Sequence, residues 1–126
     1  MDQKNSKVHS FRDLRVWQAG MDLVEHVYRL TQAFPPQEMY GLTIQMRRAA
    51  VSIPSNIAEG HIRAHSKEFL NFISIAHGSL AELQTQIEIA GRLRYLSALQ
   101  VTPLLEQAAS LSKQLHTLRS AISKRD

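Results

Sequence analysis

The chain has 126 residues, which is the size of one domain that can bury an apolar core. A hydrophobic fraction of 44% excludes a disordered chain, and the absence of cysteine excludes disulfides and thiolate metal sites. A net charge of +4 favours contact with polyanions. The basic residues concentrate towards the two ends of the sequence, in Lys4, Lys7 and Arg12 and in Lys113, Arg119, Lys124 and Arg125.

The first ten residues are polar, and no apolar run follows their lysines, so the sequence does not predict a signal peptide. No apolar stretch is long enough to cross a membrane. We therefore expect a cytoplasmic protein without a membrane partner. Residues 1–10 predict a flexible basic tail, and residues 11–126 predict a single domain. Few glycines and prolines among many alanines, leucines and glutamines indicate that this domain is helical.

Residues 14–34 predict a first helix, with Asp13 as its N-cap and Pro35-Pro36 as its end. Its large apolar residues form two neighbouring sets, which together cover more than one stripe. Such a wide face belongs either to a deeply buried helix or to an oligomer interface, and the small size of the domain favours the interface. The two sets are Leu14, Trp17, Met21, Val24 and Tyr28, and Val16, Leu23, Val27, Leu30 and Phe34.

The second helix is expected over residues 38–63. Pro54 lies inside it and cannot donate to the carbonyl of Ala50, so we predict a kink there. The core stripe is Leu42, Met46, Ala49, Ile53 and Ile57. On the other side lies a polar stripe, which is either a solvated face or a polar interface with a partner: Arg48, Ser52, Ser55, Asn56 and Glu59.

The third helix carries the most regular pattern in the chain, with apolar residues at alternating steps of four and three. Ser66 is its expected N-cap, with Glu68 in the first turn. Gly78 costs about 1 kcal/mol in a helix interior, so it either allows another backbone to approach or is a neutral substitution. The predicted seam is Phe69, Ile73, Ala76, Leu80, Leu83, Ile87 and Ala90.

The fourth helix is expected to start at Thr102-Pro103 and to end at the pair Lys124-Arg125. Its apolar stripe is Val101, Leu104, Ala108, Leu111, Leu115, Leu118 and Ile122. Four such helices with short connections predict an all-α fold: an antiparallel, up-down-up-down, left-handed four-helix bundle in which the second helix is kinked at Pro54.

The sequence predicts no enzyme. His61 and His65 have the spacing of two ligands on one helix, with Glu59 nearby, but the metalloprotease pattern H-E-x-x-H is absent. Arg63 and Lys67 would also repel a divalent cation, so we interpret the two histidines as surface residues. No catalytic triad spacing, phosphate loop or paired carboxylates are present. We therefore expect no catalytic, cofactor-binding or metal site, no cofactor and no small-molecule substrate.

Nucleic acid is the partner that the charge favours. Few aromatic side chains are available to stack on bases, so binding would be electrostatic and sensitive to salt. The candidate nucleic-acid contacts are Arg63, Lys67, Arg92, Arg94, Lys124 and Arg125.

Three segments resemble the bacterial four helix bundle proteins, also called 23S rRNA-intervening sequence proteins, and the resemblance extends over residues 11–122. The segments read F-R-D-L-R-V-W-Q-A-G from Phe11, R-R-A-A-V-S-I-P-S-N-I-A-E-G from Arg47, and S-K-E-F-L-N-F through A-H-G-S-L-A-E-L-Q-T-Q-I-E-I-A from Ser66. The positions that carry the resemblance are Trp17, Arg47, Arg48, Ser52, Asn56 to Gly60, Gly78, Ser79, Glu82 and Thr85.

The resemblance implies a bundle that assembles into a ring-like homopentamer. Some members are encoded inside insertions in large-subunit rRNA genes. A related group, the accessory variability determinants of diversity-generating retroelements, forms strongly basic pentamers that contact RNA. The near-neutral middle of this chain departs from that group.

Our leading hypothesis is a non-catalytic homo-oligomer whose assembled surface binds RNA or a ribonucleoprotein. The alternative is a protein-protein adaptor or scaffold without a nucleic-acid role. The candidate interface or partner stripe is Arg47, Arg48, Ser52, Asn56, Glu59, Gly78, Glu82 and Thr85.

Overall fold

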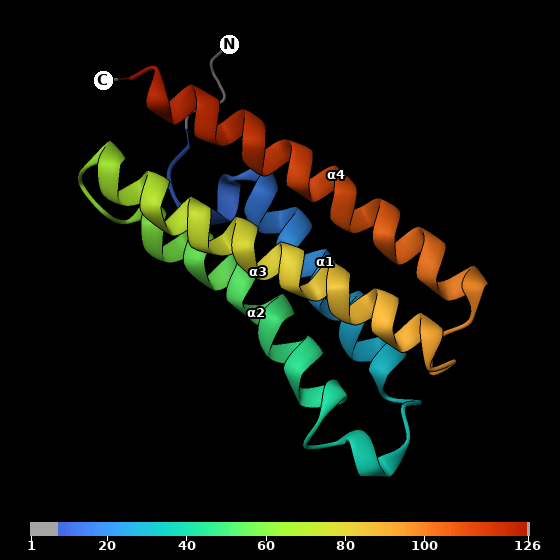
Figure 1. Ribbon diagram of the computed structural model, residues 1–126. Coiled ribbons are helices and arrows are strands. Elements are labelled where there is room, and N and C mark those ends of the chain that lie inside the picture. The colour runs from blue at the N-terminus through green and yellow to red at the C-terminus, as the bar shows by residue number, and fades with distance from the viewer. Residues whose placement is uncertain (1–7, 126) are drawn as a thin grey trace.

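The computed structural model describes residues 8–125, and over these residues the protein is all-α, with four long helices and no strand. Residues 1–7, most of the predicted basic tail, and Asp126 lie outside the described residues. None of the described helices is apolar over a length that could cross a bilayer. The helices, shown in Figure 1, are α1 (Arg15–Thr31), α2 (Leu42–His61), α3 (Ser66–Arg92) and α4 (Ala98–Ser123), with short 3₁₀ helices η1 (Phe11–Asp13) and η2 (Pro36–Glu38).

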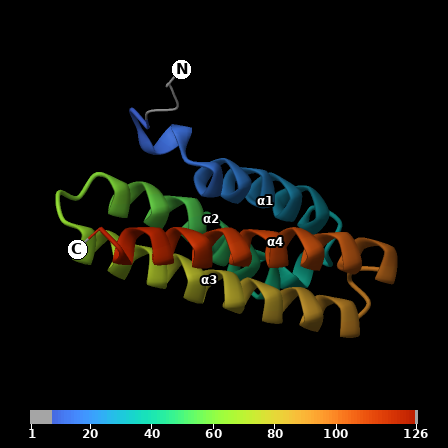
Figure 2. The same ribbon diagram turned by 90° about the horizontal axis from the view of Figure 1, so that it is seen from above.

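The four long helices enclose one apolar core. Helix α2 packs between α1 and α3, α4 packs mainly on α3, and α1 and α4 meet over a smaller area (Figure 2). The predicted seam of α3 is confirmed, because each of its residues is buried. In α4, the predicted stripe is buried except for Val101 and Leu118, which are half-buried. Pro54 lies inside α2 and is buried; the kink expected there remains a prediction.

The expected N-cap of the first helix is wrong. Asp13 ends η1, where its carboxylate accepts the backbone N–H groups of His9 and Ser10 at 2.9 and 3.1 Å. Ser10 in turn accepts the N–H of Arg12, so the two side chains form a capping box around η1. These backbone donors lower the pKa of Asp13. Helix α1 therefore begins two residues later, at Arg15, without a side-chain cap.

The second helix begins at Leu42 rather than near Glu38, which ends η2, and Gly41 stands at its N-cap position. One carboxylate oxygen of Glu38 accepts the N–H of Leu42 at 3.0 Å, and the other accepts the hydroxyl of Tyr95 at 2.9 Å. The N–H of Leu42, and then the hydroxyl of Tyr95, lower the pKa of Glu38. Glu38 thus ties the start of α2 to the turn between α3 and α4.

We predict that Glu38→Gln lowers the melting temperature at pH 7 and has no effect at about pH 2. A carboxylate whose pKa is depressed on folding stabilises the protein above its unfolded pKa, about 4.3 for glutamate, and loses this effect as the pH falls through the folded value. Thermal unfolding followed by circular dichroism between these pH values measures the difference. The control is Glu106→Gln, an exposed position on α4. A difference that stays constant from neutral to acid pH would contradict the assignment.

The starts of the last two helices differ from the prediction. Helix α3 has His65, not Ser66, at its N-cap position. Helix α4 starts four residues before Thr102, because Ser97 and Gln100 form a capping box in which the Gln100 side chain accepts the Ser97 N–H at 2.9 Å. Pro103 therefore lies inside the helix rather than at its first position. The capping box of Ser97 and Gln100, and not Pro103, therefore marks the first turn of α4.

Candidate functional site

One apolar face of the protein is left uncovered along α1 and α2. We call it the first apolar face, and it comprises Trp17, Met21, Val24 and Tyr28 of α1 with Val51 of α2. The α1 residues follow steps of four and three and so lie on one side of that helix. Met21 is 38% exposed, and Tyr28 and Val51 are each 39% exposed. The other apolar set of α1 enters the core, where Val16, Leu23, Val27 and Phe34 are buried and Leu30 is partly buried.

Two contacts fix the place of Val51 beside α1. Arg47, one turn before Val51, stacks its guanidinium 4.5 Å from the centre of the Tyr28 ring and donates to the Thr31 hydroxyl at 2.9 Å. About one turn after Val51, Pro54 packs against Gly20 of α1. A Cβ atom added to Gly20 would lie 3.4 Å from the Cβ atom of Pro54. The Arg47 side chain therefore links α2 to α1 and points away from the rest of the predicted polar stripe.

The polar stripe on the other side of α2 is partly used within the chain. The hydroxyls of Ser52 and Ser79 hydrogen-bond at 2.8 Å and so link α2 to α3. Asn56 donates to both the carbonyl and the hydroxyl of Ser52, at 2.8 and 2.9 Å. Arg48 and Glu59 are exposed, and Glu59 pairs with Arg63 at 3.1 Å. Arg48, Ser55 and Glu59 are therefore the residues of the stripe that are exposed to a partner.

A second uncovered face runs along the outer side of α3. We call it the second apolar face, and it comprises Ile75, Gly78, Glu82, Thr85 and Ile89, at alternating steps of three and four. Ile75 is 45% exposed and Ile89 is 42% exposed. A Cβ atom built on Gly78 would meet nothing within 4 Å, so no backbone of the same chain approaches this glycine. Any close approach at Gly78 must come from another molecule.

The predicted nucleic-acid contacts divide between the two ends of the bundle. Arg63, Lys67, Lys124 and Arg125 belong to the end where the α2–α3 turn lies near the C-terminal end of α4 (Figure 1). There Arg63 and Arg125 line a small polar hollow of about 110 Å³ together with His61 and His65. Arg92, the last residue of α3, and Arg94, in the turn after it, lie at the opposite end.

Arg94 also has a structural role, because its φ angle of 63° ends α3 in the left-handed conformation that glycine usually adopts.

The two histidines of the hypothetical metal pair do not share a helical face. His61 is the last residue of α2, and its ring packs against Phe69 with the centroids 5.8 Å apart. His65 lies beyond the turn, at the N-cap position of α3. Among residues 8–125, no group of three or more histidine or carboxylate side chains is placed to hold a metal ion.

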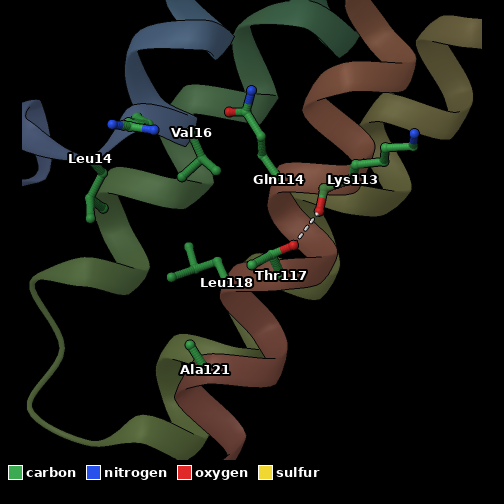
Figure 3. Close-up of a pocket in the computed structure, with 8 residues that line it drawn as sticks. Leu14, Val16, Lys113, Gln114, Thr117, Leu118 and Ala121 are labelled. Atoms are coloured by element: carbon green, nitrogen blue, oxygen red, sulfur yellow. Dashed lines mark hydrogen bonds between the residues drawn. The ribbon is translucent and has the colours of Figure 1, made fainter.

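An apolar groove that the sequence did not predict opens between the start of α1 and the end of α4 (Figure 3). Its volume is about 460 Å³. Leu118 belongs to the predicted core stripe of the fourth helix, and in the structure it also lines this groove. The hydroxyl of Thr117 is already bonded to the carbonyl of Lys113, at 3.1 Å. The remaining lining residues are Leu14, Arg15, Val16, Gln114 and Ala121.

Comparison with known proteins identifies the family of this fold. The chain resembles a crystal structure from Bacteroides thetaiotaomicron, a protein with unknown function from the S23 ribosomal protein family, with a TM-score of 0.77 and 19% sequence identity. The match covers 83% of this chain and 95% of that one. No curated protein matches. The model of the 23S rRNA-intervening sequence proteins matches residues 12–117. The chain therefore belongs to the 23S rRNA-intervening sequence protein family.

Proposed function

We propose that this protein is a non-catalytic module that assembles into a ring-like homopentamer and binds RNA or a ribonucleoprotein through the assembled surface. Each subunit would be an up-down-up-down, left-handed bundle with α2 bent at Pro54. The observation that carries the proposal is the presence of two separate uncovered apolar faces, one along α1 and α2 and the other along α3.

Two different faces favour a ring over a simple dimer. A two-fold dimer uses one self-complementary patch on both copies, whereas a closed ring of more than two copies joins two different patches head to tail. The first apolar face carries Met21, Tyr28 and Val51, and the second carries Ile75 and Ile89. Full burial of an apolar side chain of this size contributes about 1.5–3 kcal/mol, so burial of the part of Val51 or Ile89 that is still exposed contributes about 1 kcal/mol each. Several such residues at each joint could offset the cost of association.

The charge of the chain supports RNA as the partner. Each subunit has a formal net charge of +4, and several copies in one ring would present a much stronger field than one. Exposed cations lie where the α2–α3 turn is near the C-terminal end of α4, among them Arg63 and Arg125, and a ring would repeat them in every subunit. The family's description refers to an intervening sequence of 23S rRNA, which is consistent with a partner of this kind.

RNA binding is tested by titrating a labelled single-stranded RNA at about 50 and about 200 mM salt. We expect binding at the lower salt and a loss of affinity of at least about tenfold at the higher salt, because phosphate contacts release counterions. The measurement is fluorescence anisotropy with the oligomeric protein. Absence of binding at the lower salt would remove the RNA role and leave the adaptor reading, with exposed Arg48 and Glu59 as its contact residues.

A further inference from the structure

A cluster of histidine, hydroxyl and cationic side chains lies along the seam between α3 and α4. The ring nitrogen Nε2 of His77 on α3 hydrogen-bonds the hydroxyl of Ser112 on α4 at 2.8 Å. His116 and Arg119 follow Ser112 at steps of four and three, so all three lie on the same flank of α4. Two of these residues also line a shallow hollow of about 350 Å³ on the C-terminal part of α4. Its lining residues are His116, Arg119, Ser120, Ser123 and Lys124.

The charged side chains among the described residues that line this hollow, Arg119 and Lys124, are both cations. No carboxylate among residues 8–125 lies within ion-pair distance of Arg119 or Lys124. Burial lowers the pKa of His77, and the charges that lower it further are those of Arg119 and His116, both on the facing side of α4. His77 is thus a partly buried base whose neighbours on α4 include the cation Arg119. An anion that bound between these cations would relieve their repulsion.

The donors in the hollow fit a phosphate group. A guanidinium can bind two phosphate oxygens at once, an ammonium acts as a point charge, and serine hydroxyls and an imidazole N–H complete the set. A carboxylate offers two oxygens to one such fork, whereas a phosphate offers more oxygens in a tetrahedral arrangement. Arg119, Lys124 and the two serines approach the hollow from successive turns of one rigid helix.

We propose that the surface formed by His116, Arg119, Ser120, Ser123 and Lys124 is a phosphate-binding site, and that an RNA backbone supplies the phosphate. The second part rests on the RNA role proposed above. Of these residues, Lys124 was among the contacts expected from the sequence, and Arg119 belongs to the basic C-terminal segment seen there. The site places the RNA along the C-terminal half of α4 rather than across both ends of the bundle.

The test compares two charge-matched double variants of the full chain. Arg119→Gln with Lys124→Gln removes two cations from the proposed site, and Arg92→Gln with Arg94→Gln removes two from the opposite end. All four side chains are exposed, and circular dichroism verifies that the fold is retained. We expect the first pair to weaken RNA binding about tenfold or more and the second pair to weaken it less than about threefold.

A second measurement uses inorganic phosphate and RNA separately as probes of His77. Proton–carbon NMR of the histidine rings follows the pKa of His77 with and without each probe. A bound phosphate group should raise this pKa, because its negative charge offsets Arg119 and His116. The shift should disappear in Arg119→Gln with Lys124→Gln and persist in Arg92→Gln with Arg94→Gln.

The outcomes separate the site from the proposed function. Equal losses of RNA affinity in both double variants would overturn the site and leave RNA binding intact. A phosphate-induced shift of His77 without any RNA binding would support a site for free phosphate and overturn the RNA role. If RNA does not bind and phosphate leaves His77 unchanged, both proposals are wrong.

Discussion

Val51→Glu is expected to convert the oligomer into a monomer at micromolar concentration. The side chain is 39% exposed in the single chain, so a glutamate at this position can reach water and the subunit still folds. In the assembled ring the same carboxylate would be buried at a joint without a partner, which costs several kcal/mol. Glutamate is also a better helix former than valine, so α2 itself is not weakened. Light scattering coupled to size exclusion measures the mass.

The matched control is Ala109→Glu, which adds the same charge at an exposed position of α4, outside both apolar faces. This variant should keep the mass of the wild type. Ile89→Glu, on the second apolar face, should dissociate the ring as Val51→Glu does. Mixed in equal amounts, the two variants retain one intact joint between unlike copies and should form a species of two subunits. If Val51→Glu alone forms a stable dimer, the faces pair with themselves and the head-to-tail ring is wrong.

Gly60→Ala is expected to lower the free energy of unfolding by about 1–3 kcal/mol, although alanine is the better helix former. A Cβ atom at this position would lie 2.7 Å from the Cβ of Phe72 and 3.0 Å from the ring of Phe69. Neither Phe72 Cβ nor the nearby Phe69 backbone can swing away, so α2 and α3 must move apart. Chemical denaturation followed by circular dichroism measures the change.

Gly78→Ala is the control, because a Cβ atom there meets nothing within 4 Å in the same chain. It should leave the stability of the subunit unchanged or raise it by up to about 1 kcal/mol. An equal loss at Gly60 and Gly78 would show that the close approach of α2 and α3 is not the cause. A loss at Gly78 that appears together with a smaller mass would place a neighbouring copy against α3.

The buried seams could be read from the sequence because burial has a period. Leu80 and Leu83 of α3 and Leu111 and Leu115 of α4 repeat at helical steps, and all are buried. Helix starts were less predictable, because they depend on single hydrogen bonds that have no period. Glu38 bonds the N–H of Leu42, four residues along the chain, and Ser97 exchanges bonds with Gln100. In α4 the helix starts at these bonds, although Pro103 would indicate a start five residues later.

The candidate surfaces were only partly predictable, since spacing shows which side of a helix a residue occupies and not which neighbour it meets. The sequence shows that α1 carries two apolar sets but not which of them enters the core, and in the structure Met21 and Tyr28 of one set are exposed. Arg47 was grouped with the polar stripe, but it binds Thr31 and Tyr28 on the other side of α2.

The cluster around His77 and Arg119 was not predicted at all, because its members come from two helices. His77 and Ser112 are 35 positions apart in the sequence, and only the packing of α4 on α3 brings them together. The groove between α1 and α4 escaped prediction for the same reason. Its existence depends on how far two helices diverge, which the period of neither helix encodes.

The most direct test of the account is the native mass of the protein, measured by light scattering at micromolar concentration. Two uncovered faces that join head to tail predict a closed ring, and the proposed pentamer predicts a single species near five times the chain mass of 14.3 kDa. A homogeneous species of 14.3 kDa at that concentration would contradict the ring, and with it the assembled surface proposed to bind RNA.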